Sequence, residues 1–227
     1  MINYVNLEDA VLIKGLVSRL LRGHGKLSFL SYLPENSKIL DVGCGNDSPY
    51  RIKSVLAKCE YTGIDIGDYN QSKPNLANHY ILTSPENFSN EILRMPARFD
   101  AVVSAHNLEH CNDRKATFLA MIASLKKGGR IFLSFPCEGS VYFPNRKGTL
   151  NYFDDETHKY APPSFEELIE ELRTHHFEII FSSRNYKPKI LWAIGLMLEP
   201  ISLLRKRVMR GTWEFYGFES VIWAKKI

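Results

Sequence analysis

The 227-residue chain is poor in cysteine, and its few cysteines are not grouped. It contains four, none spaced as C-x-x-C or as a zinc cluster: Cys44, Cys59, Cys111 and Cys137. A disulfide scaffold and a structural zinc site are therefore excluded, and reduced thiols in a cytosolic protein are the simplest account. The N-terminal stretch MINYVNLEDAVLIKG also lacks the basic-then-apolar order of a secretory signal, so a cytoplasmic location is expected.

Long hydrophobic runs are missing as well. The most apolar stretch, residues 190–204, is shorter than the roughly 20 residues that span a bilayer, and Glu199–Pro200 is predicted to break it. No transmembrane segment is therefore expected. A lid or core helix is the plain interpretation of this stretch, and a peripheral membrane contact through residues 190–207 is the alternative.

Charge of one sign is not in large excess. The formal net charge is +4, with 24% charged and 44% hydrophobic residues, as in an ordinary soluble globular protein. This balance permits an anionic substrate but disfavours nucleic acid as a partner. The length fits a single domain over residues 1–227, with a helical cap at 1–34 and lid insertions at 136–163 and 186–215.

The most informative segment that is present reads KILDVGCGNDSPY, residues 38–50. Its short apolar run is typical of a buried strand, and Gly43 and Gly45 let the following turn approach a ligand closely. Ser48 is predicted to cap a helix whose first residue is Pro49. A strand, a glycine turn and a helix in this order hold a nucleotide-like cofactor at the carboxyl end of the strand in α/β folds.

Strand and helix patterns alternate along the rest of the chain. Six further strands are predicted, at residues 61–66, 79–83, 99–104, 130–135, 177–181 and 219–224. Helices are predicted at 9–22, from Asn112 or Asp113 to a stop at Gly128–Gly129, and behind a capping box at Ser164. This alternation predicts an α/β fold, with a mostly parallel sheet and helices on both faces.

Four segments in order resemble the motifs of class I S-adenosylmethionine (SAM) methyltransferases. They are KILDVGCG, an acidic strand end at Asp65, FDAVVSAHNLEH and LKKGGRIFLSFP, and the resemblance covers roughly residues 36–185. It implies a Rossmann-like fold with seven strands, the last antiparallel, and SAM-dependent methyl transfer that releases S-adenosylhomocysteine. The subtype it resembles is the small-molecule group with a Glu-His pair after the fourth strand.

The resemblance also implies a set of cofactor contacts. Asp41 would order the glycine turn or reach the amine of SAM, and Asp65 would bind the ribose hydroxyls. The full predicted set is Asp41, Gly43, Cys44, Gly45, Asp65, Ile66, Ser84, Glu86, Ser104, Ala105 and His106. Two departures from the family pattern leave details open: Asp47 stands at the usual third glycine, and the acidic position after the third strand is Ser84 or Glu86.

Methyl transfer to an oxygen atom requires a group that takes the proton of the acceptor, and histidine suits this task near neutral pH. His110 or His158 is predicted to be this general base. The irregular stretch from 138 to 163 would recognise the acceptor, a small molecule or glycan intermediate. Its predicted acceptor contacts are Arg146, Tyr152 and Tyr160.

A metal-assisted enzyme is one alternative. Similar methyltransferases of small-RNA 3′ ends and of ubiquinone biosynthesis carry E-x-x-E-H after the fourth strand and use it to hold a divalent metal. Here the first position is histidine, and the corresponding residues are His106, Glu109 and His110, with His158 as a further ligand. No metal site is assigned on this basis.

Three other functions compete with small-molecule methylation. A nucleic-acid enzyme of the amino-adenine type is disfavoured, because residues 104–107 read SAHN in place of the N/D-P-P-Y/F signature. A nicotinamide-dependent oxidoreductase is disfavoured by Ser48, where the dinucleotide fingerprint has glycine or alanine. A non-catalytic SAM-binding domain stays open, and product formation would distinguish it.

Overall fold

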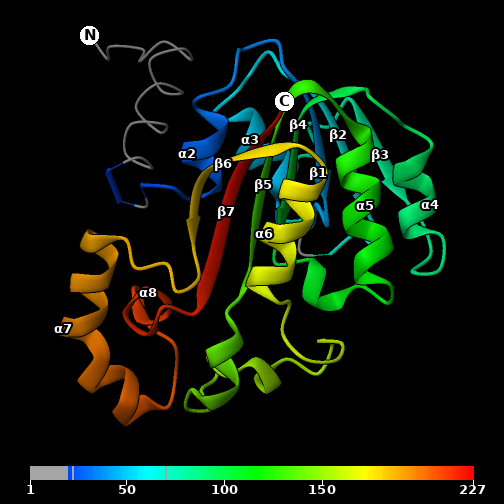
Figure 1. Cartoon of the computed structure of the whole chain (residues 1–227). Coiled ribbons are helices and arrows are strands. Elements are labelled where there is room, and N and C mark those ends of the chain that lie inside the picture. Colours follow the sequence, from blue (N-terminus) through cyan, green and yellow to red (C-terminus); the bar gives the residue numbers. More distant parts are fainter. Residues whose placement is uncertain (1–19, 22, 70) are drawn as a thin grey trace, which may run out of the picture.

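The computed structural model of the protein describes residues 20–227 apart from 22 and 70. Seven strands form one sheet (Figure 1): β1 (Lys38–Val42), β2 (Glu60–Asp65), β3 (His79–Leu82), β4 (Phe99–Ala105), β5 (Leu125–Pro136), β6 (Phe177–Ser183) and β7 (Glu219–Lys226). Their order in the sheet is β3-β2-β1-β4-β5-β7-β6, and β7 is antiparallel to both of its neighbours. The expected α/β sheet of seven strands, mostly parallel with an antiparallel last strand, is confirmed.

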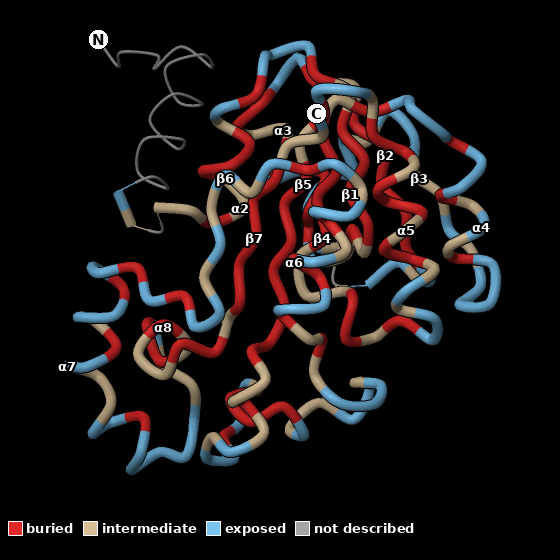
Figure 2. Tube along the Cα trace, in the orientation of Figure 1, coloured by how far each residue is buried: buried red, intermediate tan, exposed pale blue. Residues whose placement is uncertain are grey.

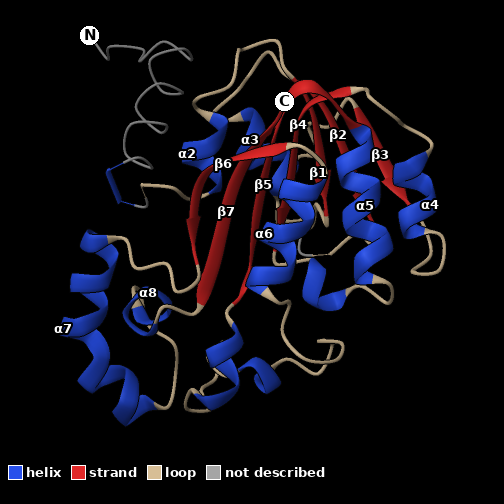
Figure 3. Cartoon of the chain, in the orientation of Figure 1, coloured by secondary structure: helices blue, strands red, loops and turns tan. Residues whose placement is uncertain are grey.

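Helices cover both faces of the sheet, as Figure 3 shows. One core lies beneath α4 (Phe88–Leu93), α5 (Arg114–Ser124) and α6 (Phe165–Thr174), and the other beneath α2 (Lys26–Leu30) and α3 (Ser48–Lys53). Because both faces are covered, the central strands are buried along most of their length (Figure 2). The helix predicted at 9–22, and with it much of the predicted cap at 1–34, lies outside the described residues.

The parallel strands end side by side at one edge of the sheet. Strand pairing places Val42 opposite Ser104 and Asp65 opposite Leu82. The loops that follow β1, β2 and β4 therefore leave the sheet next to one another. This carboxyl edge is where open α/β sheets bind their ligands.

Among the element boundaries that differ from the prediction, those of α3 and β5 are the most informative. α3 begins at Ser48, with Asp47 as its N-cap, one residue earlier than expected. The Ser48 hydroxyl does not cap the helix but donates a hydrogen bond to Asp41. β5 begins at Leu125, which pairs with Phe99 of β4. The register then shifts, and the next pair is Ala101 with Arg130. The pair Gly128–Gly129 therefore lies in an irregular part of the strand and does not end the preceding helix.

Two segments extend beyond the carboxyl edge, and both were predicted to be lid insertions (Figure 1). The first lid segment, residues 136–163, contains the short 3-10 helices η2 (Glu138–Tyr142) and η3 (Tyr152–Asp154). The second lid segment, residues 186–215, contains α7 (Lys189–Arg205) and the start of α8 (Thr212–Tyr216). The prediction that Glu199–Pro200 breaks the apolar stretch is wrong, because α7 continues through Pro200. A proline costs such a helix chiefly one backbone hydrogen bond and a local clash, which packing against neighbouring elements can offset.

Candidate active site

The turn after β1 is built from residues in the left-handed conformation. Gly43 has φ +77°, and Asn46 and Asp47 have φ 56° and 59°. Asparagine and aspartate adopt this conformation more readily than other residues with a side chain. The Asp47 carboxylate also accepts hydrogen bonds from the backbone N–H groups of Ser72 and Lys73. At the position of the usual third glycine, Asp47 therefore has a left-handed backbone that its side-chain hydrogen bonds support.

The Asp65 carboxylate lies directly against this turn. Its Oδ2 accepts a hydrogen bond from the Gly45 N–H at 2.8 Å, and its Oδ1 accepts one from the Ile66 N–H at 2.7 Å. Burial raises the pKa of Asp65, while the hydrogen bonds from Ile66, Gly45 and Gly67 act in the opposite direction. A carboxylate offers about four acceptor positions, so these backbone groups leave room for a ligand hydroxyl.

Asp41 lies at the end of β1 and is fully buried. Its Oδ2 accepts hydrogen bonds from the hydroxyl groups of Ser48 and, at 2.8 Å, Tyr61. Its Oδ1 has no partner among the described residues. A buried carboxylate oxygen without a donor is costly, so this atom is suited to a water or a ligand amine. The role of Tyr61 was not predicted from the sequence, and Ser48 was predicted to be a helix cap, because helix-start patterns say nothing about partners on a neighbouring strand.

The protein itself requires glycine at position 43. A Cβ there would lie 2.5 Å from Oδ1 of Asn107, at a φ that side chains rarely adopt. Asn107 comes shortly after β4, so the segment after β4 lies directly against the turn after β1. The sequence suggested that Gly43 makes room for a ligand, and no local pattern pointed to Asn107.

His106 is held between two carboxylates. Its Nδ1 lies 3.1 Å from Oε1 of Glu109, and its Nε2 lies 3.1 Å from Oε1 of Glu219. Burial favours the neutral imidazole, but hydrogen bonds and charge from both glutamates outweigh it and raise the pKa of His106 to about 10. His106 is therefore protonated near neutral pH and has no lone pair with which to act as a base. Its predicted contact with the cofactor stays a prediction.

Three side chains beyond the end of β4 form a cluster: Glu109 and His110 from η1 (Leu108–His110) and His158 from the first lid segment. One potential ligand atom from each lies within 4.8 Å of the others. His158 Nδ1 is 2.5 Å from the Tyr152 carbonyl oxygen and donates to it, so Nε2 retains its lone pair. Burial lowers the pKa of His158, which keeps the ring neutral near pH 7. The structure thus brings together both histidines that were predicted as the general base.

Arg114 clamps the first lid segment to the end of β4. Its guanidinium donates hydrogen bonds to the carbonyl oxygen of Leu108 and to those of Lys159 and Ala161. The clamp holds the neighbouring His158 beside η1. The sequence gave no signal for this role, because an arginine at the start of a helix resembles any solvated surface residue.

The remaining predicted cofactor residues lie at or beside the same edge of the sheet. Ser104 is buried, and its hydroxyl has no partner among the residues that the structure describes. Cys44 is also buried, and burial raises the pKa of its thiol, so it is an inert packing residue. The half-buried or exposed members of the set are Ile66, Ser84, Glu86 and Ala105. Their contacts with a cofactor stay predictions.

The predicted acceptor contacts differ in their surroundings. Arg146 is only 4% exposed, and its guanidinium pairs with both carboxylate oxygens of Glu199 at 2.8 and 2.6 Å. This pair raises the pKa of Arg146 and joins the first lid segment to α7. Tyr152 is fully buried with its ring stacked on His158, whereas Tyr160 is exposed. Arg146 and Tyr152 thus have partners within the protein, and their contact with an acceptor stays a prediction.

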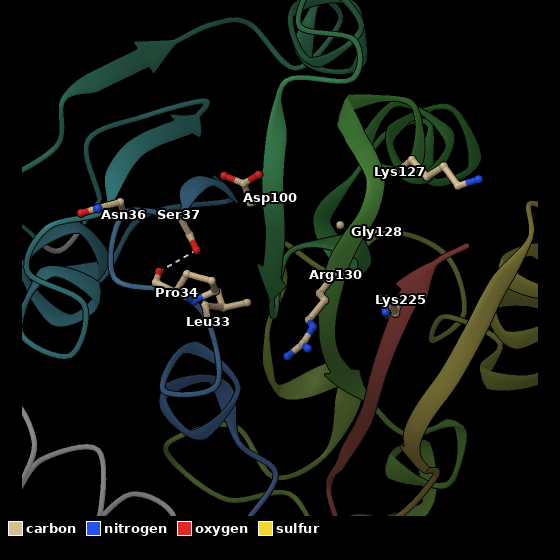
Figure 4. Close-up of a pocket in the computed structure, with 10 residues that line it drawn as sticks. Leu33, Pro34, Asn36, Ser37, Asp100, Lys127, Gly128, Arg130 and Lys225 are labelled. Atoms are coloured by element: carbon tan, nitrogen blue, oxygen red, sulfur yellow. Dashed lines mark hydrogen bonds between the residues drawn. The ribbon is translucent and has the colours of Figure 1, made fainter.

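A hollow of about 550 Å³ lies at the opposite edge of the sheet (Figure 4). Its lining includes Pro34, Asp100, Arg130 and Lys225, which come from the loop before β1, the starts of β4 and β5 and the end of β7. None of the predicted site residues lines it. The hollow is therefore separate from the candidate active site at the carboxyl edge.

Comparison with known proteins agrees with this geometry. A family model described as a methyltransferase domain matches residues 16–182. The ubiquinone biosynthesis O-methyltransferase of Pseudomonas aeruginosa is 31% identical over 106 residues, which cover 43% of this chain and 43% of that protein. The sterol 24-C-methyltransferase of Candida albicans is 31% identical over 102 residues, which cover 43% of this chain and 27% of that protein. The chain thus aligns with less than half of the length of either relative.

A solved structure extends the likeness to nearly the whole fold. The S-adenosylmethionine-dependent methyltransferase from Mesorhizobium loti superimposes with a TM-score of 0.58, covering 91% of this chain and 100% of that one. The two sequences are 14% identical. At this level of identity the likeness establishes the fold, and the chemistry has to be argued from the site.

Proposed function

This chain belongs to the class I SAM-dependent methyltransferases, and on that premise we propose that it methylates an oxygen atom of a small molecule or glycan intermediate. The proposal rests mainly on the contact between the glycine turn and Asp65. In this contact the Gly45 N–H donates a hydrogen bond to the Asp65 carboxylate at 2.8 Å. Asn107 lies against Gly43 and directly precedes η1, and in this proposal His158 beside η1 would accept the proton of the acceptor. The P. aeruginosa relative, named as an O-methyltransferase, supports an oxygen acceptor.

The residues around the turn fit SAM. Asp65 retains acceptor capacity for the ribose hydroxyls. The unpartnered Oδ1 of Asp41 would accept a hydrogen bond from the methionine amine, directly or through a water. The backbone from Gly43 to Gly45 would lie along the methionine and ribose. Bound SAM would supply a methyl group activated by its cationic sulfur.

The protein contributes positioning and proton removal, because methyl transfer needs little other help from side chains. The Tyr152 carbonyl accepts the Nδ1 proton of His158 and thereby leaves the lone pair on Nε2 of this ring, which clusters with Glu109 and His110. An acceptor hydroxyl bound beside this nitrogen would give up its proton to it. His106 would stay protonated throughout, since its pKa is about 10.

Removal of the two candidate bases tests the proposal. A screen with radiolabelled SAM against fractionated cell extract would first identify the acceptor. His158→Ala and His110→Ala are expected to bind SAM normally, while at least one loses about 10²- to 10⁴-fold in turnover, the usual contribution of a general base. His79→Ala at the exposed start of β3 serves as the matched control. Normal turnover in both variants would refute the assignment of the base.

A metal-assisted methyltransferase is the second candidate, and one observation favours it. Glu109 is fully buried, and its Oε2 has no partner within the described part of the chain. This oxygen belongs to the carboxylate that clusters with His110 and His158. A carboxylate and two imidazoles form a reasonable ligand set for Mn²⁺, Fe²⁺ or Zn²⁺.

Elemental analysis of the purified protein distinguishes the two candidates. If the enzyme is metal-assisted, the wild type should contain one divalent ion per chain and Glu109→Gln should contain none. Chelation should then abolish the activity, and added metal should restore it. Full activity in a metal-free preparation would leave the histidine as the base.

A further inference from the structure

The outward face of α7 is apolar along its whole length. Between Lys189 and Arg205 the helix contains one charged side chain, Glu199, and this pairs with the buried Arg146. The outward face presents the exposed side chains of Trp192, Leu196, Met197, Ile201, Leu203 and Leu204, with Met197 69% and Leu204 85% exposed. At 3.6 residues per turn these positions span about half of the helix circumference. A helix face that stays in water normally carries polar groups, so this face is suited to an apolar partner.

The inward face of α7 fixes the helix in this orientation. A Cβ at Gly195 would lie 1.9 Å from the carbonyl oxygen of Gly211, the residue just before α8. The backbone of α7 is therefore in direct contact with the backbone at the start of α8. Arg146 and Glu199 add a buried ion pair from the first lid segment. The apolar side chains therefore point outward from a helix that the protein holds in place.

Cationic residues lie at both ends of this face. Lys187 and Lys189 are exposed at the start of α7, and Arg205, Lys206 and Arg207 are exposed at its end. A strip of apolar side chains with positive charge at each end complements an interface that is apolar inside and anionic at its surface.

We infer that α7 docks on an anionic lipid bilayer, with its outward apolar side chains at the level of the headgroups and upper acyl chains. Among the described residues no helix is long and apolar enough to cross a membrane, so the contact lies in the interface. A second copy of the chain is a poorer occupant. Because both ends of α7 are basic, parallel and antiparallel pairing of two such helices would each place cations against cations.

Docking through α7 also orients the lid segments. Both lid segments extend from the carboxyl edge of the sheet, and α7 belongs to one of them (Figure 1). Docking through α7 would therefore place the bilayer against the second lid segment, which extends from the same edge of the sheet as the first. This orientation does not depend on which acceptor is methylated.

Vesicle flotation tests the inference. The full-length protein is expected to float with vesicles of phosphatidylcholine mixed with phosphatidylglycerol and to bind phosphatidylcholine alone at least about tenfold more weakly. Met197→Glu combined with Leu204→Glu should lower the binding to mixed vesicles by about tenfold or more, since it places charge in the apolar contact. Brominated lipids should quench Trp192 fluorescence, and this quenching should disappear in Trp192→Phe.

The controls separate docking from a general loss of structure. Leu93→Glu introduces a charge at another exposed leucine, 47% exposed at the end of α4, and should leave vesicle binding unchanged. Both variants should unfold at nearly the wild-type temperature. Failure of the wild type to float, or unchanged binding by the α7 variant, overturns the inference. A dimer that Met197→Glu and Leu204→Glu dissociate, with no vesicle binding by the wild type, would instead identify a second copy as the occupant.

Discussion

At the scale of single residues, Asp65 has two tasks at once. It accepts the Gly45 N–H and so holds the turn after β1 in place, and in the proposed function its remaining acceptor capacity would bind the ribose hydroxyls of SAM. Substitution is therefore expected to affect both the shape of the turn and the proposed contact with the ribose. The two effects can be separated, because only the second depends on a bound ligand.

Asp65→Ala is predicted to weaken binding of S-adenosylhomocysteine by about 1–3 kcal/mol, the cost of leaving buried polar groups unpaired. Isothermal titration calorimetry measures this change. Asp65→Asn, which keeps one acceptor oxygen, should lie between the wild type and the alanine variant. Asp100→Ala is a matched control at the other edge of the sheet, where Asp100 pairs with Lys126. Equal losses of affinity in the Asp65 and Asp100 variants would contradict the assigned contact.

The sequence could identify residues whose role depends on nearby positions in the chain. Gly45 and Asp65 each follow an apolar run, and the motif order placed them at strand ends that the structure confirms. Arg146 could not be interpreted in this way, because its partner Glu199 is remote in the sequence and meets it only after α7 has packed. An exposed arginine and a buried, paired arginine look alike until the fold is known.

At the scale of secondary-structure elements, the contact between α7 and α8 depends on two glycines. Gly195 faces the carbonyl oxygen of Gly211, and Gly211 itself has φ +82°. A methyl group at 195 cannot fit without moving one backbone away from the other. The same contact supports the outward position of the apolar face of α7.

Gly195→Ala is predicted to destabilise the protein by about 1–3 kcal/mol, the usual cost of overpacking a tight contact. Urea unfolding measures the change. Gly139→Ala is the matched control, because a Cβ there would meet only the Cys137 sulfur at an ordinary 3.9 Å. If Gly195→Ala were as stable as Gly139→Ala, the two backbones could move apart to admit the methyl group without loss of stability, contrary to the prediction.

Element types were predictable here, whereas some element boundaries were not. Apolar runs and a capping serine marked the strands and α6, where Ser164 accepts a hydrogen bond from the Glu167 N–H as expected. The pattern failed at Gly128–Gly129, since glycine suits an irregular strand as well as a helix end. It failed again at Pro200, where the surroundings of α7 accommodate a residue that alone would favour a break.

At the scale of the whole molecule, ionised carboxylates support the two lid segments. Asp154 is partly buried, but hydrogen bonds from the backbone of Arg146 and from Asn145 lower its pKa below the usual range. The pairing of Glu199 with Arg146 lowers the pKa of Glu199 in the same way. Groups with a lowered folded-state pKa stabilise the protein above their unfolded-state pKa and lose this effect as the pH falls.

The difference in stability between the wild type and Asp154→Asn with Glu199→Gln is therefore predicted to depend on pH. It should be largest and constant above about pH 5, and it should shrink below about pH 4, where the wild-type carboxyls take up protons. Thermal unfolding from pH 3 to pH 7 measures the difference. A gap that stays constant over this range would show that the two carboxylates act through packing and not through their charge.

The hydrogen bonds of Arg114 determine whether the proposed general base stays beside η1. Residues 158–161 include His158, which we propose as the general base, and two carbonyl oxygens that accept hydrogen bonds from Arg114, which also binds Leu108 of η1. Loss of the Arg114 hydrogen bonds would release this segment and withdraw the proposed base. The turn after β1 would keep its own hydrogen bond to Asp65. In that state the protein would bind its methyl donor but would transfer no methyl group, either to water or to the acceptor.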